Sequence, residues 1–518
     1  MRVIFNEDNN HYWYSRFHRN MPVNERTLRL FIKQYADTDI TDFSVNVNAS
    51  VSSTESLVMQ DYIQKYMADS ENGVTVDYTN TYAKLLYDLK TRGIDPYAIW
   101  FDEIKKCGMR GLLNFRMNDC HAFIGCKTSL VKSEMIEKHP EYYICTGREP
   151  TGYFDKCLNY LLEPVRAYFL SYISEQLERY DVDGIELDFT REPYCFPVGR
   201  EDEGRKVMLD FLGEVRELAN RISSERNKKI AVHLLCQANP ITAYECGFDL
   251  AAAAKRGYVD AIIPSPRFST VNPDIPLEIW RALVGDTQLG AVQQLLVRAY
   301  PNDKWVSTDL AMAYGQTAAF TARGADFVYL YNQFDIPSDD PDDENYENLY
   351  YAGSVTAKWK TVARTLGHTE LLPYRTRRNP LTYDDFAGLA EPTAARLPLE
   401  LSPGKFSAFR ISTGKILETQ VSYVNIETAE PVDRKHITVY VNGVRAVCSK
   451  KDMTNHHIVS RERSLSFVFH AAAETTAAVE ICAEVPCRIE YTCLRAETRT
   501  ACQITAGSNI CSFAHENV

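Results

Sequence analysis

The feature of this sequence that most constrains its fold is a regular alternation of short apolar runs with longer helical segments across residues 1–375. Such alternation is typical of βαβ units, in which helices join and cover the strands of a parallel sheet. Eight such runs predict a (β/α)8 TIM barrel of the α/β class. An open doubly wound sheet is the alternative, but no GxGxxG motif follows the first run. The expected strands are Arg2–Asp8, Asp42–Ser50, Gly111–Asp119, Asp183–Thr190, Lys229–Gln237, Val259–Pro266, Leu289–Leu296 (which also fits a helix) and Ala325–Asp335.

The pattern changes near residue 395. The stretch "KHITVYVNGVRAVCS" alternates apolar and polar residues around Asn442-Gly443, a strong signal for a two-residue hairpin. Further alternating runs follow, so residues 395–518 are predicted to form an antiparallel β-sandwich. Residues 376–394, which are rich in proline and turn residues, are expected to link it to the barrel of residues 1–375.

The net charge and the composition of the chain argue against several classes of binding partner. The net charge of −12 argues against nucleic acid, whose phosphates need a basic surface. No apolar run is long enough to predict a membrane span, and the first residues read as structure and not as a signal peptide, so a cytoplasmic location is expected unless a signal precedes this chain. No CxxC pair or cofactor motif occurs, so neither a metal nor a cofactor is predicted. A homo-oligomer is compatible with these properties.

The expected fourth strand, "DGIELDFT", carries two carboxylates on one face. Successive strand side chains point to opposite faces, so Glu186 and Asp188 share a side with Thr190, while Leu187 and Phe189 face the other way. In a barrel the apolar side meets the helices and the polar side faces the axis. A buried charge costs several kcal/mol unless it is paired and hydrogen-bonded. The polar axis therefore predicts a functional site at the carboxyl ends of the strands, or else an internal network in which Arg116 and His233 neutralise Glu186.

Depth along the strand separates the two acids. Asp188 is expected to lie about 6.5 Å nearer the barrel mouth than Glu186. Asp188 is therefore predicted to be the exposed reagent and general acid, and Glu186 its support. Two like charges at this spacing also raise the pKa of one of them, which suits a general acid. The second catalytic carboxylate is expected to be Asp119 or Asp335, with Asp8 as a further candidate.

Aromatic and planar polar residues follow several of the expected strands. Together they suit a sugar ring, whose apolar face stacks on aromatics and whose hydroxyls take hydrogen bonds. The residues expected to contact such a substrate are Asn6, Asp8, Asn48, Arg116, Asn118, His121, Arg191, Tyr194, His233 and Asn332.

The segment "EPVRAYFLSYISEQLERYDVDGIELDF", with "RMND-x-H" before it and "GADFVYLYNQFD" after it, resembles the glycoside-hydrolase family called family 10-like, mostly uncharacterised bacterial barrel proteins. Its fourth strand is also similar to the DGxDxDxE motif of family 18 chitinases, with Asp183, Glu186 and Asp188 on acidic positions. Thr190 stands where the terminal catalytic glutamate of that motif would be, which argues against chitinase chemistry. The resemblance implies a glycoside hydrolase acting on a carbohydrate.

Three functions follow from these observations. The first is a glycoside hydrolase with paired carboxylates, inverting if the partner of Asp188 lies across the barrel and leaves room for water. The second is a carbohydrate-binding barrel that has lost catalysis, suggested by Thr190 and by Gln293 and Gln294, which stand where retaining enzymes usually carry a nucleophile. The third is a metal-assisted hydrolase with ligands among Asp8, Asp119, His121 and His233.

Overall fold

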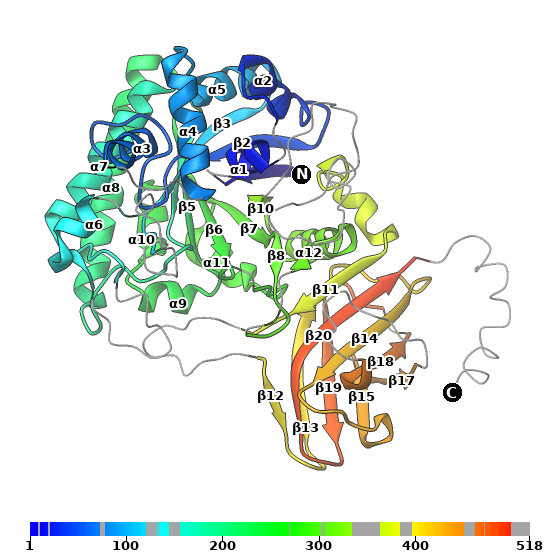
Figure 1. The fold of residues 1–518 in the computed structure, drawn as a ribbon. Coiled ribbons are helices and arrows are strands. Elements are labelled where there is room, and N and C mark those ends of the chain that lie inside the picture. Colours follow the sequence, from blue (N-terminus) through cyan, green and yellow to red (C-terminus); the bar gives the residue numbers. More distant parts are fainter. Residues whose placement is uncertain are drawn as a thin grey trace.

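A computed structural model contains the predicted closed barrel (Figure 1). Its parallel strands follow the order β1-β10-β7-β6-β5-β4-β3-β2. The structure describes residues 1–8, 11–18, 21–72, 78–120, 132, 134–144, 156–268, 270–301, 303, 306–333, 363–383, 396–449, 461–470 and 472–498. The barrel strands are β1 (Arg2–Glu7), β2 (Ile40–Asn46), β3 (Arg110–Arg116), β4 (Gly184–Asp188), β5 (Ala231–Gln237), β6 (Ala261–Ser265), β7 (Gln288–Gln294) and β10 (Phe327–Gln333). Each expected strand is confirmed, including the seventh.

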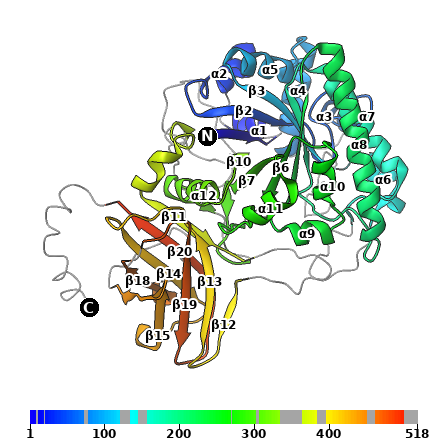
Figure 2. The same cartoon turned by 180° about the vertical axis from the view of Figure 1, so that it is seen from behind.

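Helices surround the barrel on its outer side (Figures 1 and 2). Several of them begin at a side-chain cap; in α5, for example, the Asp95 side chain accepts hydrogen bonds from Tyr97 N and Ala98 N and a proline follows it. The helices are α1 (His11–His18), α2 (Glu25–Lys33), α3 (Tyr62–Glu71), α4 (Tyr78–Thr91), α5 (Pro96–Lys106), α6 (Glu134–Lys138), α7 (Glu163–Arg179), α8 (Glu201–Arg226), α9 (Pro240–Glu245), α10 (Leu250–Lys255), α11 (Leu277–Val284) and α12 (Leu310–Ala322). No helix in the described part of the chain is long and apolar enough to cross a membrane.

The two faces of the barrel sheet have different surroundings, as strand parity predicts. Phe43, Leu187 and Phe189 belong to the large apolar cluster between strands and helices. A smaller cluster fills part of the barrel interior and includes Leu112, Val292 and Phe327. The axis is therefore not polar throughout: apolar residues share it with the polar network that surrounds Glu186.

The predicted β-sandwich follows the barrel and lies beside α12 (Figure 2). One sheet has the order β11-β20-β14-β18-β17, with β12 also paired to β20, and the other has the order β13-β19-β15-β16. Its strands are β11 (Arg377–Leu381), β12 (Leu399–Leu401), β13 (Phe406–Ser412), β14 (Val421–Thr428), β15 (Ile437–Val441), β16 (Val444–Arg445), β17 (Val447–Cys448), β18 (Ser464–Phe469), β19 (Thr476–Ala483) and β20 (Cys487–Glu497). An apolar core lies between the sheets.

Two details refine the sequence-based description of this part. Asn442 and Gly443 both have positive φ angles, 51° and 76°, so the expected hairpin turn joins β15 to β16. Residues 377–381, within the stretch expected to be a linker, form β11, which pairs with β20. Asn379 on β11 donates to the Gly315 carbonyl of α12 over 2.8 Å. This part of the stretch is therefore an element of the sandwich that contacts the barrel.

Candidate active site

Glu186 lies on β4 inside the barrel and is fully buried. The Tyr329 hydroxyl donates to Glu186 Oε2 over 2.6 Å, the Ser44 hydroxyl donates to the same oxygen, and Asn114 Nδ2 lies 3.4 Å from it. His233 Nδ1 lies 3.3 Å from Glu186 Oε1. Four neighbours thus engage both oxygens. His233, and not Arg116, is therefore the neighbour of Glu186, and the supporting role expected for Glu186 stays a prediction.

Asp188 is as deeply enclosed as Glu186, at 1% exposure. Tyr331 on β10 donates its hydroxyl hydrogen to Asp188 Oδ2 over 2.7 Å. Thr190 donates its backbone N–H over 2.8 Å and its hydroxyl over 2.6 Å to Asp188 Oδ1. The expectation of an exposed reagent is therefore wrong, because counting strand positions ignores the side chains that close over the strand end. Three hydrogen bonds from protein groups thus occupy both oxygens of Asp188.

Arg116, at the end of β3, connects the acids of the mouth. Its Nη2 lies 2.8 Å from Asp8 Oδ2 and 2.9 Å from Asn332 Oδ1, and its Nη1 lies 3.5 Å from Asp119 Oδ2. Burial acts to lower the pKa of Arg116, but the negative charge of Asp8, with contributions from Tyr331 and Asp119, outweighs it and holds the pKa well above its ordinary value. Arg116 therefore stays a cation and keeps two carboxylates close together.

Several residues expected to bind sugar serve the protein scaffold. Asn48 donates to the Arg116 carbonyl over 2.9 Å and accepts from its N–H. Asn118 accepts from Leu158 N over 2.8 Å and donates to the Tyr194 carbonyl over 3.1 Å. These contacts occupy both amides. They fix the loops that follow β2, β3 and β4.

A similar contact joins β1 to β10. Asn332 has a φ of +53°, a conformation that asparagine tolerates better than most residues. Its backbone N–H donates to Asn6 Oδ1 over 2.9 Å, and Asn6 Nδ2 donates to the Ser44 hydroxyl over 3.3 Å. The turn directs the Asn332 side chain towards Arg116. Asn6 and Asn332 thus help to hold the guanidinium in place.

Glu192 was not among the expected residues. It follows Asp188 in the stretch "DFTREPY", is 1% exposed, and its Oε2 has no hydrogen-bond partner among the described residues. Burial, together with the negative charges of Asp119 and Asp188, raises the pKa of Glu192 to about 8 against the opposing positive charges of Arg191 and Arg116. Glu192 is therefore a protonated carboxylic acid at neutral pH. The available signal was a third acid just beyond the fourth strand, where strand parity no longer applies.

Two glutamines at the strand ends have buried side-chain oxygens without a hydrogen-bond partner in the described residues, Gln237 Oε1 on β5 and Gln294 Oε1 on β7. The amide of Gln237 lies 3.4 Å from the Pro193 carbonyl, and that of Gln294 donates to the Pro266 carbonyl over 3.1 Å. Gln293 Oε1 on β7 is likewise without a partner there, but the amide of Gln293 donates towards α12, to Thr317 Oγ1 over 2.5 Å. Unsatisfied buried acceptors are rare and call for a donor.

The remaining residues that were expected to bind substrate do not all lie at the barrel mouth. The Arg191 guanidinium carbon lies 4.5 Å from the centre of the Phe268 ring, and Tyr194 is buried. His121 and Asp335 lie outside the described residues, so their places in the site stay predictions. His233 borders a cavity of about 620 Å³ at the opposite end of the barrel, together with Arg110 and Lys229, residues at or before the starts of their strands.

Two basic residues that border the cavity at this opposite end of the barrel are paired with acids of the protein. Lys229 Nζ lies 2.8 Å from Asp260 Oδ1, and Arg110 forms an ion pair with Asp42. Residues at this end of a barrel usually serve stability, whereas functional groups gather at the carboxyl ends of the strands. The candidate active site is therefore the mouth cluster, which we define as Asp8, Arg116, Asp119, Asp188, Arg191, Glu192, Tyr331 and Asn332.

The described residues do not support the metal-assisted alternative. Within them, no group of three or more His, Cys, Asp or Glu side chains is arranged to hold a metal ion. His233, one of the proposed ligands, contacts Glu186 inside the barrel and is separated from the mouth cluster.

Comparison with known proteins finds distant structural likenesses. No model of a known protein family matches the chain, and no curated protein matches it. It is similar to α-L-fucosidase isoenzyme 1 from Paenibacillus thiaminolyticus, with 12% identity, 93% of this chain and 97% of that chain covered, and a TM-score of 0.34. It is also similar to chitinase ChiW from Paenibacillus sp., with 9% identity, 95% of this chain and 56% of that chain covered, and a TM-score of 0.39. A third likeness is to the GH36 α-galactosidase AgaB from Geobacillus stearothermophilus, with 12% identity, 93% of this chain and 55% of that chain covered, and a TM-score of 0.37.

These neighbours are glycoside hydrolases, and the chain spans little more than half the length of the chitinase and of the α-galactosidase. The family 10-like resemblance is not among the matches and stays a hypothesis. Likeness at this level carries no argument about activity. The function has to be inferred from the chemistry of the mouth cluster.

Proposed function

We propose that this protein is a glycoside hydrolase whose acid is Glu192 and whose ionised partner is Asp119. The observation that carries the proposal is the separation of the carboxyl groups into two kinds within one mouth cluster. Glu192 is kept protonated by burial and by neighbouring negative charge, whereas Asp119 pairs with Arg116. Neighbouring acids whose environments differ in this way are the usual mark of an acid and base pair.

The chemistry follows from these protonation states. Glu192 gives its proton to the glycosidic oxygen while the bond from that oxygen to the anomeric carbon breaks. On one route Asp119 accepts a proton from the water that attacks the anomeric carbon. On the other, Asp119 attacks that carbon itself and forms a glycosyl ester, which water then hydrolyses while Glu192, now ionised, accepts the proton of the water; the two routes give opposite stereochemical outcomes. Arg116 pairs with Asp119 over 3.5 Å and also contacts Asp8 and Asn332. Asp188, expected from the sequence to be the acid, becomes a positioning residue that holds Tyr331.

The unsatisfied acceptors support a ligand rich in hydroxyl groups. Gln237 Oε1 and Gln294 Oε1 are buried at the ends of β5 and β7 and have no donor among the described residues. Sugar hydroxyls supply such donors, and a site that depends on them rejects analogues that lack them. The substrate class proposed is therefore an oligosaccharide or polysaccharide.

The test is hydrolysis of α- and β-linked oligosaccharides by the wild-type protein, Glu192→Gln and Asp119→Asn. We expect both variants to lose a factor of about 100 to 10,000 in kcat. Tyr244→Ala, which alters an exposed residue on α9, is the control and should keep full activity. Hydrolysis that survives Glu192→Gln unchanged would remove Glu192 as the acid.

Binding without hydrolysis is the second candidate. It is favoured by the engagement of Asp188 and Glu186, whose oxygens all accept hydrogen bonds from protein groups. In that case oligosaccharides bind to the wild-type protein without being cleaved, and Asp188→Asn leaves the affinity unchanged.

A further inference from the structure

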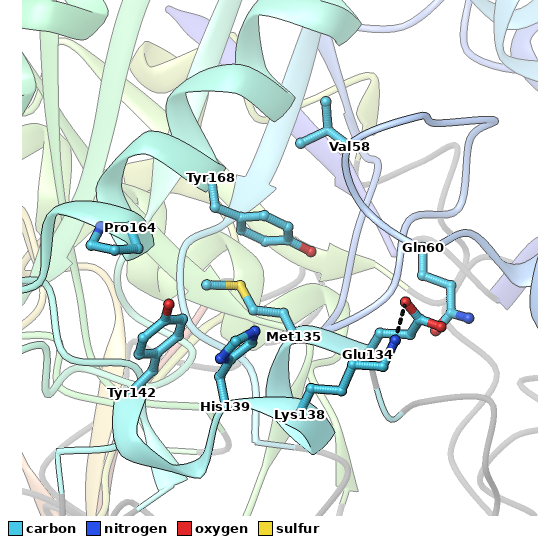
Figure 3. A pocket seen from close by; sticks show the side chains of 9 residues that line it. All are labelled: Val58, Gln60, Glu134, Met135, Lys138, His139, Tyr142, Pro164 and Tyr168. Carbon is cyan, nitrogen blue, oxygen red and sulfur yellow. Dashed lines mark ion pairs between the residues drawn. The ribbon is translucent and has the colours of Figure 1, made fainter.

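A second cavity, of about 330 Å³, shares no lining residue with the mouth cluster (Figure 3). It is bordered by the loop after β2, by α6 and the turn that follows it, and by the start of α7. We call it the rim pocket. Its lining residues are Val58, Gln60, Glu134, Met135, Lys138, His139, Tyr142, Pro164 and Tyr168.

The topology places the rim pocket at the same end of the barrel as the mouth cluster. The loop with Val58 and Gln60 follows β2, and α6 follows β3, so both leave the barrel at carboxyl ends. Pro164 and Tyr168 belong to the first part of α7, which runs back towards the start of β4. Loops and helix starts at this end form the functional face of such barrels.

The lining combines aromatic faces with polar groups. His139 and Tyr142 stack with their ring centres 4.7 Å apart and their planes within 10° of parallel. Tyr168 comes from α7, and Figure 3 shows the Met135 side chain of α6 between the Tyr168 ring and the His139 ring. Apolar faces accompanied by a few polar groups are typical of sites for sugar rings.

One polar atom of the lining points to a ligand. Gln60 Oε1 is buried and has no hydrogen-bond partner among the described residues. The charged residues of the lining, Glu134 and Lys138, form an ion pair of 3.1 Å (Figure 3). The pair leaves no surplus of either charge, so a neutral donor of hydrogen bonds fits this pocket better than an anion or a cation.

Backbone contacts hold two of the walls in place. Leu57 N donates to Glu175 Oε1 of α7 over 2.6 Å, which fixes the loop after β2. Asn159 N donates to the Tyr142 carbonyl over 2.8 Å, which fixes the aromatic wall. The neighbouring Leu158 N donates to Asn118, next to Asp119 of the mouth cluster. A pocket formed in advance loses less conformational entropy when it binds a ligand.

We propose that the rim pocket is a second carbohydrate subsite, which holds one neutral pyranose ring of an oligosaccharide whose scissile bond lies in the mouth cluster. The proposal rests on the proposed function, because it takes the substrate of the mouth cluster to be a chain of sugars. One face of the ring stacks on the His139–Tyr142 pair, and a hydroxyl donates to Gln60 Oε1. The subsite would add affinity for long chains and none for short ones.

The test compares chain lengths. The ligands are neutral gluco-oligosaccharides of one to six units, α- and β-linked in separate series, and chitin oligosaccharides of the same lengths. Each ligand is titrated into Glu192→Gln, and into Glu192→Gln that also carries Tyr142→Ala or Gln60→Ala. Tyr374→Ala, an exposed tyrosine far along the chain, is the matched control. We expect Tyr142→Ala to weaken binding of the longest ligands by about tenfold and to leave the shortest unchanged. Gln60→Ala should act in the same direction, and it removes no aromatic packing if Tyr142→Ala proves unstable.

The outcomes separate this proposal from the proposed function. Length-dependent binding that depends on Tyr142 or Gln60 supports the rim pocket, even if the wild-type protein hydrolyses none of the ligands and the proposed function fails. Equal affinities in all variants at every length overturn the rim pocket, even if hydrolysis is observed and lost in Glu192→Gln. Absence of binding by every ligand overturns it as well.

Discussion

Tyr331 donates its hydroxyl hydrogen to Asp188 across the barrel mouth, over 2.7 Å, and so joins β10 to β4. It is the partner of Asp188 Oδ2 among the described residues, whereas the other oxygen is held by Thr190. A matching contact lies deeper, where Tyr329 donates to Glu186 Oε2 over 2.6 Å. The deeper oxygen has further donors in Ser44 and Asn114. Loss of the Tyr331 hydroxyl is therefore expected to reduce stability more than loss of the Tyr329 hydroxyl.

Tyr331→Phe is expected to lower the free energy of unfolding by about 1 to 3 kcal/mol, because it leaves a buried carboxylate oxygen without its donor. Tyr329→Phe should cost less than about 1 kcal/mol, since two donors to Glu186 Oε2 remain. Urea unfolding of both variants measures the difference. Equal losses for the two would contradict the contrast drawn between the two oxygens.

Activity should depend on the protonation of Glu192. The pKa of about 8 means that the acid keeps its proton at neutral pH and loses it above that value. We expect kcat/KM to fall as the pH rises through about 8, and the residual activity of Glu192→Gln to lack this basic limb. The measurement is a pH profile of hydrolysis for both proteins. A basic limb that persists in the variant would assign it to another group.

Glu192 should also weaken the fold at neutral pH. Its pKa is raised in the folded state, so the folded protein holds a proton that the unfolded chain has released. The free energy of unfolding is therefore expected to fall as the pH rises between about 4.5 and 8, with this contribution lost in that window. Glu192→Gln removes the effect and should raise stability at pH 7 by up to about 3 kcal/mol. Urea unfolding at several pH values tests this, and a less stable variant at pH 7 would contradict it.

Arg116→Met is expected to have two effects. Loss of the guanidinium leaves Asp8 and Asp119 buried without this cation and should cost about 3 to 5 kcal/mol of unfolding free energy. It also removes a charge that lowers the pKa of Glu192, so the basic limb of kcat/KM should move to higher pH. Lys84→Met, which breaks an exposed pair with Asp88, is the control and should change stability by less than about 1 kcal/mol. If the basic limb of kcat/KM stays at the same pH in Arg116→Met, Arg116 does not lower the pKa of Glu192.

The sequence predicts the barrel well because the period of the apolar residues is a local property. The alternation in "DGIELDFT" places Leu187 and Phe189 in the core between strands and helices, and Glu186 inside the barrel. The turn at Asn442-Gly443 is equally local, since it needs two residues with positive φ. By the same reasoning β11 was missed, because its pairing with β20 joins residues more than a hundred positions apart.

The site is less predictable, because it depends on contacts between distant segments. Asp188 and Tyr331 are 143 positions apart, and the residues of the fourth strand alone do not predict that the Tyr331 hydroxyl contacts Asp188. Glu192 lies in a loop, where side-chain direction has no fixed period. Its raised pKa comes from burial, and burial in a loop is set by the rest of the fold. Sequence patterns could therefore find the right end of the barrel but not the division of roles among its acids.

The contact between the barrel and the sandwich offers a last prediction. Asp274, which precedes α11, is fully buried; it accepts from Ser412 Oγ over 2.8 Å and pairs with Arg410 over 2.9 Å and with Arg323. Ser412 and Arg410 lie on β13, and Arg323 directly follows α12, so one carboxylate joins the two domains. Asp274→Ala leaves these cations facing each other and should cost about 3 to 5 kcal/mol.

Calorimetry is the measurement for Asp274→Ala. We expect the sandwich to melt at a lower temperature than the barrel, so that one transition becomes two. Asp181→Ala is the control: Asp181 is an exposed carboxylate paired with Lys105 and Lys228 within the barrel, and the change should leave the transition whole. A single transition with an unchanged midpoint in Asp274→Ala would show that other contacts, such as the one from Asn379 to Gly315, hold the two domains together without this carboxylate.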